Sequence, residues 1–333
     1  IKQTLYRVSS SSPVVQALEK AVQNGKQVTV LMEVKARFDE ANNILMARRL
    51  EKAGAHVIYG LVGLKTHSKC TLVIRREKDG IRRYVHVATG NYNASTAKLY
   101  TDLGILTCSD RFGIDASAFF NLLSGYSDPP IWDSFIVAPI NLRQRCIELI
   151  DREIHFAKNG EDAHMIAKMN SLLDKGIIEK LYEASQAGVK IELIVRGICV
   201  LIPGIPGASD NITVRSIVGR FLEHSRIFWF RNGGREELYV SSADWMPRNL
   251  NDRVELMVPI EDPEIKRRLK QMVDIELSDN QKAHIMQADG TWLKTISAEN
   301  QLCAQEYFQK IAEKRDAEDE MTLAQKLEPY TPV

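Results

Sequence analysis

Short apolar segments alternate with amphipathic ones along this chain, and the alternation predicts strands that alternate with helices. Residues 28–34 are a nearly continuous apolar run, a pattern typical of strands buried on both faces of a sheet, and residues 190–195 are predicted to be a second strand. Ahead of the first run, Ser12 and Pro13 are suited to begin a helix, and Gly25 is suited to end it. This succession predicts the α/β class, in which ligands bind at the C-terminal ends of strands.

The order of segments in the first part of the chain recurs in the second part. The corresponding segments are 28–37 with 190–198, and 67–76 with 224–233. Between the two copies, Ser127-Asp128-Pro129-Pro130 interrupts the pattern. We therefore predict two α/β domains, at residues 1–134 and 135–333, that form a pseudo-two-fold duplicated unit. The second domain ends in a charged helical tail.

Each predicted domain contains a histidine followed two positions later by a basic residue. On a strand, such positions point to the same side, so His67 and Lys69 would meet one substrate. A neutral imidazole can attack as a nucleophile, and an ammonium group beside it can hold anionic oxygens. His224 and Arg226 repeat the arrangement ahead of a second apolar run. Two copies predict one site between the two domains.

Composition and charge narrow the class of protein. Of the 333 residues, 44% are hydrophobic and 26% are charged, which is typical of a soluble globular protein. The net charge of +1 gives no general attraction to nucleic acid or membrane, so anions must be bound by local arrangement. The five cysteines include no Cys-x-x-Cys pair, which argues against a disulfide framework or a zinc site and indicates reduced thiols in the cytoplasm.

Several ordered motifs resemble those of one known family. They are Ala36-Arg37-Phe38-Asp39-Glu40, Gly63-Leu64-Lys65-Thr66-His67-Ser68-Lys69, Thr89-Gly90-Asn91-Tyr92-Asn93, Leu99-Tyr100-Thr101-Asp102, Val195-Arg196-Gly197 and Ser241-Ser242-Ala243-Asp244-Trp245-Met246. Through these motifs the chain resembles bacterial polyphosphate kinase of the phosphohistidine type. The resemblance implies two phospholipase-D-like C-terminal domains that transfer the terminal phosphate of ATP reversibly to polyphosphate. ATP or ADP would be the nucleotide substrate, with Mg²⁺ as cofactor.

The resemblance also implies roles for individual residues. His67 would receive the phosphate, Lys69 would neutralise its oxygens, and His224 would be a second catalytic histidine. The residues expected to bind ATP or phosphate are Tyr100, Asp102, Arg196, His224 and Arg226, and Asp102 would also orient a histidine. Arg7 and Arg37 match two arginines of the magnesium–phosphate cluster. Because a guanidinium has no lone pair for a metal, they would grip phosphate oxygens that also bind Mg²⁺.

Further expectations concern the longer protein. A strand-like segment already occupies residues 1–8, so we expect the chain to be a fragment of a longer protein. The family's N-terminal domain, which helps to hold the adenine, has no counterpart in this sequence, so we expect slow kinase activity from the fragment alone. The full-length enzyme is expected to be a homo-oligomer without a nucleic-acid partner, and peripheral membrane association is left open.

Two other functions compete with this interpretation. A phosphodiesterase, nuclease or phospholipase of the phospholipase-D type needs an aspartate five residues after the basic residue of the motif. Ile74 and Arg231 occupy those positions, which argues against a diesterase. A non-catalytic scaffold for polyanions is the third interpretation, and the presence of both histidines with their basic partners argues against it. A basic cluster is either a solvated hairpin or a guide for a polyanion; its residues are Arg75, Arg76, Lys78, Arg82 and Arg83.

Overall fold

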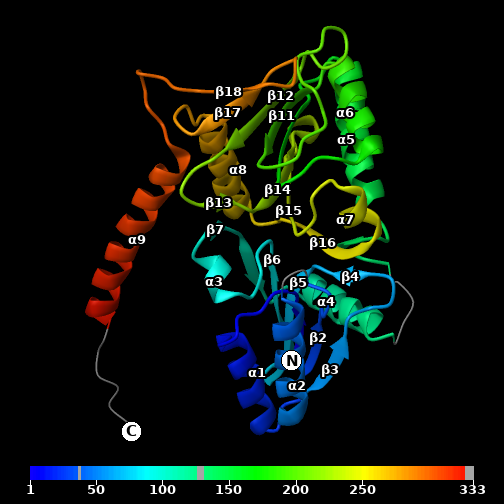
Figure 1. Ribbon diagram of the computed structural model, residues 1–333, viewed down its shortest axis with the longest axis vertical. Coiled ribbons are helices and arrows are strands. Elements are labelled where there is room, and N and C mark those ends of the chain that lie inside the picture. Colours follow the sequence, from blue (N-terminus) through cyan, green and yellow to red (C-terminus); the bar gives the residue numbers. More distant parts are fainter. Residues whose placement is uncertain (37–38, 126–130, 327–333) are drawn as a thin grey trace.

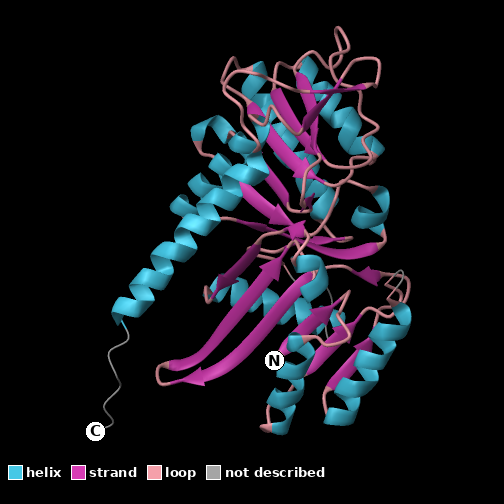
Figure 2. Ribbon diagram, turned by 60° about the vertical axis from the view of Figure 1, so that its left-hand side comes forward, coloured by secondary structure: helices cyan, strands magenta, loops and turns pink. Residues whose placement is uncertain are grey.

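The computed structural model of the chain describes residues 1–36, 39–125 and 131–326, with side chains up to residue 315. Two sheets flanked by helices lie one above the other and meet near the middle of the molecule (Figure 1). Turned by 60°, the molecule shows helices flanking the strands in both halves (Figure 2). The predicted interruption at Ser127-Asp128-Pro129-Pro130 lies outside the described residues, because residues 126–130 are among those not described.

The first half of the chain forms a six-stranded sheet. In order across the sheet, its strands are β3 (His56–Tyr59), β2 (Thr29–Met32), β1 (Lys2–Leu5), β5 (Lys69–Glu77), β6 (Gly80–Ala88) and β8 (Gly104–Thr107). Apolar side chains of α1 (Pro13–Gln23) and α2 (Glu40–Ala53) pack on one face, and those of α4 (Asp110–Leu123) pack on the other. As predicted, the Ser12 hydroxyl caps α1, where it accepts from the amide of Val15 at 3.3 Å.

The second half forms the larger sheet. Its strands, in order, are β18 (Trp292–Lys294), β17 (Ala283–Met286), β12 (Ile212–Ile217), β11 (Lys190–Val195), β10 (His164–Met169), β14 (Arg226–Phe230), β15 (Glu237–Ser241), β16 (Arg253–Pro259) and β4 (Lys65–Thr66), with β9 (Ile136–Ala138) also paired to β16. The helices α5 (Leu142–Lys158) and α6 (Lys175–Gln186) cover one face. The helix α8 (Pro263–Leu277) covers the other face through Leu269 and Val273.

Smaller elements complete the fold. They are α3 (Ala94–Ala97), α7 (Pro247–Asn251), the 3-10 turn η1 (Asn232–Gly234) and the terminal helix α9 (Ala304–Lys326). Figure 1 shows α9 extending from the second sheet along the side of the molecule. Among the described residues, none of the helices combines the length and the apolar character that crossing a membrane requires.

The two halves repeat one topology, as the sequence predicts. The order β3-β2-β1-β5-β6-β8 of the first sheet recurs as β12-β11-β10-β14-β15-β16 in the second. Corresponding pairs also run in the same sense, since β1–β2 and β10–β11 are parallel whereas β1–β5 and β10–β14 are antiparallel. The predicted α/β fold with a duplicated unit is therefore confirmed.

Each half also contributes a short strand to the other half. Strand β4 pairs in parallel with the start of β16, and β13 (Leu222–Glu223) pairs in parallel with β7 (Tyr100–Thr101). The prediction that one strand runs through His67 and Lys69 is wrong. The chain leaves β4 after Thr66, passes His67 and Ser68 outside any strand, and enters β5 at Lys69. The sequence did not reveal this break because the residues on both sides of it have strand character.

Candidate active site

His67 of the first half is paired with a glutamate of the second half. The two oxygens of Glu255 each lie 2.9 Å from His67 Nδ1, and Glu255 also accepts from the Ser242 hydroxyl at 2.5 Å. The pairing of β4 with β16 explains the contact, because Thr66 lies opposite Val254 and the next residues on both chains are His67 and Glu255. With Nδ1 committed to this carboxylate, Nε2 is the ring nitrogen left for chemistry.

Lys69 lies against the same aromatic ring as His67. The ring of Tyr6 meets the imidazole of His67 edge-on at 4.6 Å between centroids, and the Lys69 ammonium lies 5.4 Å from its centre. The ammonium also donates to the backbone oxygen of His67. The two side chains that the sequence placed on one strand are therefore brought together by Tyr6 and by this hydrogen bond instead.

Burial sets the charges around His67. It lowers the pKa of His67 well below its usual value, and the cations Lys69, Arg253 and Arg226 add to this effect. Burial also lowers the pKa of Lys69 to about 7, which the nearby Glu255 carboxylate opposes. It raises the pKa of Glu255 to about 7, against the pull of Lys69 and Arg253. His67 is consequently a neutral imidazole at neutral pH, the form that can act as a nucleophile.

His224 has the equivalent arrangement, with the two halves exchanged. Its Nδ1 lies 2.7 Å from a carboxylate oxygen of Asp102, which comes from the first half, and Asp102 accepts from the Thr89 hydroxyl at 2.6 Å. The ring of Tyr100 lies 5.0 Å from the imidazole. Each histidine therefore takes its carboxylate from the opposite half. The two motifs also interact electrostatically, since His224 lowers the pKa of His67 and Lys69 lowers the pKa of His224.

Sequence reasoning missed Glu255, although the repeat contains a signal for it. Asp102 follows Thr89 by 13 residues, and Glu255 follows Ser242 by 13 residues. In both halves the hydroxyl at the first position donates to the carboxylate at the second. A comparison of the two copies at this spacing would have identified Glu255 as the counterpart of Asp102.

Arg226, the basic residue of the second motif, lies in a network of hydrogen bonds. Arg226 donates two hydrogen bonds of 3.1 Å to the Asp244 carboxylate and one of 2.7 Å to the backbone oxygen of His224. Asn170 also donates to Asp244, and its side-chain oxygen accepts from Arg196 Nε at 2.7 Å. This network leaves the remaining donors of Arg196 for a ligand.

The surroundings of the two histidine motifs differ by one charged residue. Thr89 and Ser242 correspond, so the counterpart of Asp244 in the first half is Asn91. Arg226 is therefore neutralised by a carboxylate, whereas Lys69 forms no ion pair with any residue that the structure describes. An ammonium that is not engaged in a direct ion pair is better able to hold anionic oxygens of a substrate. This asymmetry favours His67 over His224 as the residue that handles an anionic group.

The remaining predictions concern Arg7, Arg37 and the basic hairpin. Arg7 is half-buried, forms an ion pair of 3.1 Å with Asp39, and has its guanidinium 5.9 Å from the ring of Tyr6. Arg37 lies outside the described residues. On the basic hairpin, Arg75 and Arg82 pair with the acidic side chains of Glu77 and Asp79, which fits a solvated hairpin.

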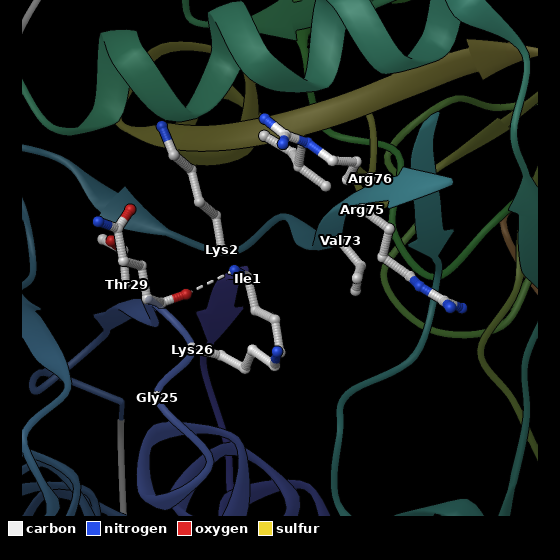
Figure 3. Close-up of a pocket in the computed structure, with 10 residues that line it drawn as sticks. Ile1, Lys2, Gly25, Lys26, Thr29, Val73, Arg75 and Arg76 are labelled. Carbon is white, nitrogen blue, oxygen red and sulfur yellow. Dashed lines mark hydrogen bonds between the residues drawn. The ribbon is translucent and has the colours of Figure 1, made fainter. Parts of the chain in front are cut away.

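A pocket of about 800 Å³ opens beside the start of β1, away from the two histidine motifs. Lys2, Lys26, Arg75 and Arg76 surround it, and the amino group of Ile1 donates across it to the backbone (Figure 3). None of the candidate site residues lines this pocket. The pocket is therefore separate from the two histidine motifs.

The buried histidines make a prediction about stability and pH. Burial and Arg226 lower the pKa of His224 to about 4, against the pull of Asp102. Between pH 6.5 and 4 the unfolded chain binds a proton at His224 that the folded chain does not, so stability falls as the pH falls through this window. We expect the loss from His224 to be about 3 kcal/mol, because one pKa unit is worth about 1.4 kcal/mol.

Urea unfolding at several pH values tests this prediction. The variant His224→Asn should lose about 3 kcal/mol less free energy of unfolding than the wild type between pH 6.5 and 4. His67 titrates in both proteins and so cancels from the difference. Parallel stability curves for the two proteins would contradict a depressed pKa at His224.

Comparison with known families identifies the chain. A model described as polyphosphate kinase C-terminal domain 1 matches residues 1–129, and one described as polyphosphate kinase C-terminal domain 2 matches residues 135–305. The chain belongs to the polyphosphate kinase family.

Curated polyphosphate kinases are similar to the chain over most of its length. That of Halalkalibacterium halodurans is 61% identical over 283 residues, which are 85% of this chain and 40% of that protein. That of a Synechocystis strain is 55% identical over 317 residues, 94% of this chain and 44% of that protein. The chain thus spans about two fifths of the length of these polyphosphate kinases.

Solved structures agree with this family. The crystal structure of polyphosphate kinase from Porphyromonas gingivalis superposes with a TM-score of 0.87 at 38% identity, covering 95% of this chain and 48% of that one. Phosphatidylserine synthase from Haemophilus influenzae superposes with a TM-score of 0.55 at 12% identity, over 96% of this chain and 89% of that one. The second likeness shows the fold alone.

Proposed function

We propose that the chain carries the catalytic centre for reversible phosphate transfer between ATP and polyphosphate, through a phosphohistidine at His67. The observation that carries the proposal is the contact of His67 Nδ1 with Glu255 from the opposite half. A carboxylate that holds the Nδ1 proton fixes the tautomer in which Nε2 has the free lone pair. Nε2 is then the nucleophile, and the Lys69 ammonium donates to the backbone oxygen of the same residue.

The transfer proceeds in two successive displacements at the same phosphorus. His67 Nε2 attacks the terminal phosphorus of ATP, the bond from that phosphorus to the bridging oxygen breaks, and ADP leaves with the electron pair. A terminal oxygen of polyphosphate then attacks the same phosphorus and releases neutral His67. The Lys69 ammonium stabilises the negative charge on the transferred oxygens in both steps. Because both steps are reversible, polyphosphate can also phosphorylate ADP.

His224 and the arginines position phosphates in this scheme. At neutral pH His224 is uncharged, since its pKa is lowered to about 4, so it acts through a hydrogen bond and not as a cation. Tyr100 lies beside the ring of His224. Arg226 donates to the backbone oxygen of His224, and Arg196 belongs to the same hydrogen-bond network through Asn170. We assign these residues, together with Asp102, to the binding of nucleotide or phosphate. Arg7 and Arg37 are assigned to phosphate oxygens, with Arg37 placed by the sequence alone.

Magnesium enters the proposal with the nucleotide. Within residues 1–36, 39–125 and 131–315, no three side chains of His, Cys, Asp or Glu gather so as to hold a metal ion. The donors near His67 are ammonium and guanidinium groups, which suit phosphate oxygens and not a cation. Mg²⁺ is therefore treated as part of the ATP substrate, where it neutralises adjacent phosphate charges.

The proposal extends to the organisation of the protein. We assign residues 1–134 and 135–333 to two domains, supported by family matches that end at residue 129 and begin at residue 135. We place the enzyme in the cytoplasm, supported by five free cysteines. A homo-oligomer in the full-length enzyme rests on the resemblance to the family, and peripheral membrane association is left to experiment.

Labelling distinguishes this function from its competitors. The chain is incubated with Mg²⁺ and γ-labelled ATP, with labelled polyphosphate, or with a chromogenic phosphodiester. We expect label on the protein from the first two donors, lost in acid and kept in base, because a phosphohistidine has this stability. Hydrolysis of the diester without protein label would indicate a phospholipase-D-type diesterase. Salt-sensitive binding of polyphosphate without either reaction would indicate a scaffold.

Replacing Arg196 by lysine should lower turnover strongly. The guanidinium donates to Asn170 through Nε and keeps two further nitrogens for phosphate, whereas a lysine cannot do both with one ammonium. We expect a loss of about 10²-fold or more in kcat/KM for ATP in the full-length enzyme. Arg231→Lys, at an arginine paired with Asp162 and Glu236, is the matched control and should retain wild-type kinetics. Equal rates in the two variants would remove Arg196 from the site.

A further inference from the structure

Three candidate site residues depend on a single short pair of strands. The ladder of β7 and β13 pairs Tyr100 with Leu222 and Thr101 with Glu223. Asp102 follows the first strand directly and His224 follows the second. The amide of His224 also donates to the backbone oxygen of Thr101 at 3.2 Å. The positions of Tyr100, Asp102 and His224 are therefore set by where this ladder lies.

The ladder is less supported than its counterpart beside His67. Strand β4 belongs to the ten-stranded sheet, because β16 pairs with it and also with β15 and β9. In contrast, β7 and β13 form a sheet of two strands only. An isolated two-stranded pair is marginally stable in water. A cavity of about 360 Å³ also lies against Thr101, Asp102 and Glu223, so close packing does not back the ladder there.

Glu223 supplies the missing support through three hydrogen bonds. Its Oε2 accepts from Lys168 Nζ and from the Thr101 hydroxyl, both at 2.7 Å, and its Oε1 accepts from Gln305 Nε2 at 2.6 Å. Glu223 is buried, with 5% of its surface exposed. These donors come from the large sheet, from the ladder itself and from α9. Glu223, the residue immediately before His224, thus links the ladder to β10 and α9.

Lys168 links the ladder to the core of the second half. Its ammonium is 1% exposed and also pairs with Glu276 of α8. Burial acts to lower the pKa of Lys168, but Glu276 and Glu223 hold it above its usual value. The ion pairs are therefore strong enough to keep a buried lysine charged. Removing one partner of such a cluster leaves an uncompensated buried charge.

Gln305 links the ladder to the terminal helix. Its side chain accepts from the amide of Phe221 at 3.0 Å and donates to the carbonyl of Phe221 at 2.8 Å. A Cβ atom at Gly219 would lie 2.3 Å from Gln305 Oε1, so the glycine allows this close approach. The start of α9 is itself fixed, because the amide of Ala304 donates to the buried Asp279 at 2.7 Å.

We propose that Lys168 and Gln305 are positioning residues for His224, which they hold in place through Glu223 and the ladder. The importance of His224 for phosphate transfer rests on the proposed function, whereas its placement does not. Neither Lys168 nor Gln305 is assigned to the substrate. The helix α9 contains no candidate site residue, but through Gln305 it helps to position His224, which is assigned to the binding of nucleotide or phosphate.

Histidine NMR tests the placement directly. The 333-residue chain is labelled with ¹⁵N at histidine, and His224 and His67 are assigned from the variants His224→Asn and His67→Gln. In Gln305→Ala we expect the apparent pKa of His224 to rise by about one unit toward the ordinary value, because a loosened ladder admits water. His67 should titrate as in the wild type. Gln309→Ala is the matched control, since this exposed glutamine, one turn along α9, donates to Glu313 and forms no hydrogen bond with the ladder.

A second variant guards against a general loss of structure. Thr101→Val keeps the shape of β7 and removes a different donor to Glu223, so it should shift His224 in the same direction. Unchanged titration of His224 in Gln305→Ala and Thr101→Val would overturn the proposal. Equal shifts of His224 and His67 would overturn it too, because they would mark a general change. Absence of protein label in the wild type would instead contradict the proposed function and leave these NMR results standing.

Discussion

Replacing His67 by glutamine is expected to abolish the acid-labile phosphate label and to lower ATP-dependent polyphosphate synthesis by about 10⁴-fold or more in the full-length enzyme. Glutamine keeps a polar side chain of similar length but offers no nucleophilic ring nitrogen. The neighbouring side chains do not replace it, since Lys69 Nζ is held by the backbone oxygen of His67 and Tyr6 contributes only its ring. The measurements are the stoichiometry of label and the steady-state rate.

His164→Gln is the matched control for this experiment. His164 also lies in a histidine–carboxylate pair, at 2.8 Å from Glu192, but on β10 at the edge of the second half's core. It should keep full labelling. A label that persists in His67→Gln, or that maps to His224 in the wild type, would disprove the assignment of the nucleophile.

Replacing Glu255 by glutamine should lower the rate of His67 phosphorylation by about 10²-fold or more. The amide is nearly isosteric, but its nitrogen can donate to Nδ1 and so stabilise the tautomer that carries its proton on Nε2. A pH profile adds a second test. Because burial raises the pKa of Glu255 to about 7, the wild-type rate should fall as the pH drops through 7 and the carboxylate becomes protonated. The glutamine variant should lack this fall on the acid side, because the other group near pH 7, Lys69, gains a favourable positive charge as the pH drops.

Glu153 provides the control for Glu255. It is a fully buried glutamate of α5 that accepts from the backbone amides of Asn232 and His164, with no contact to either histidine motif. Glu153→Gln should therefore lower stability but leave the rate of labelling near the wild-type value. Similar kinetic losses in Glu153→Gln and Glu255→Gln would show that any buried carboxylate matters equally, and would refute the specific role of Glu255.

Local sequence signals predicted individual elements well. Strand β11 begins and ends at the predicted residues 190 and 195, and Ser12 caps α1 as its residue type predicts. These features depend on interactions within a few residues. The duplication was also visible, because both copies keep the same order of segments.

The long-range parts of the site were not predictable in the same way. The contact between His67 and Glu255 spans 188 positions and depends on the register of β4 against β16. A two-residue strand such as β4 has no pattern that names its partner. The break after Thr66 was missed for a related reason, since a strand that changes sheets looks continuous in the sequence. Only the shared spacing of the two copies carried information about Glu255.

The exchange of short strands between the halves has a consequence for the newly made chain. Until the halves dock, His67 has no carboxylate at Nδ1 and His224 has none either, since each partner belongs to the other half. Under the proposed function, the two imidazoles of a partly folded chain lack the carboxylates that orient them, so phosphate transfer would reach its full rate only after the two halves dock. Reactivity would then report that the fold is complete.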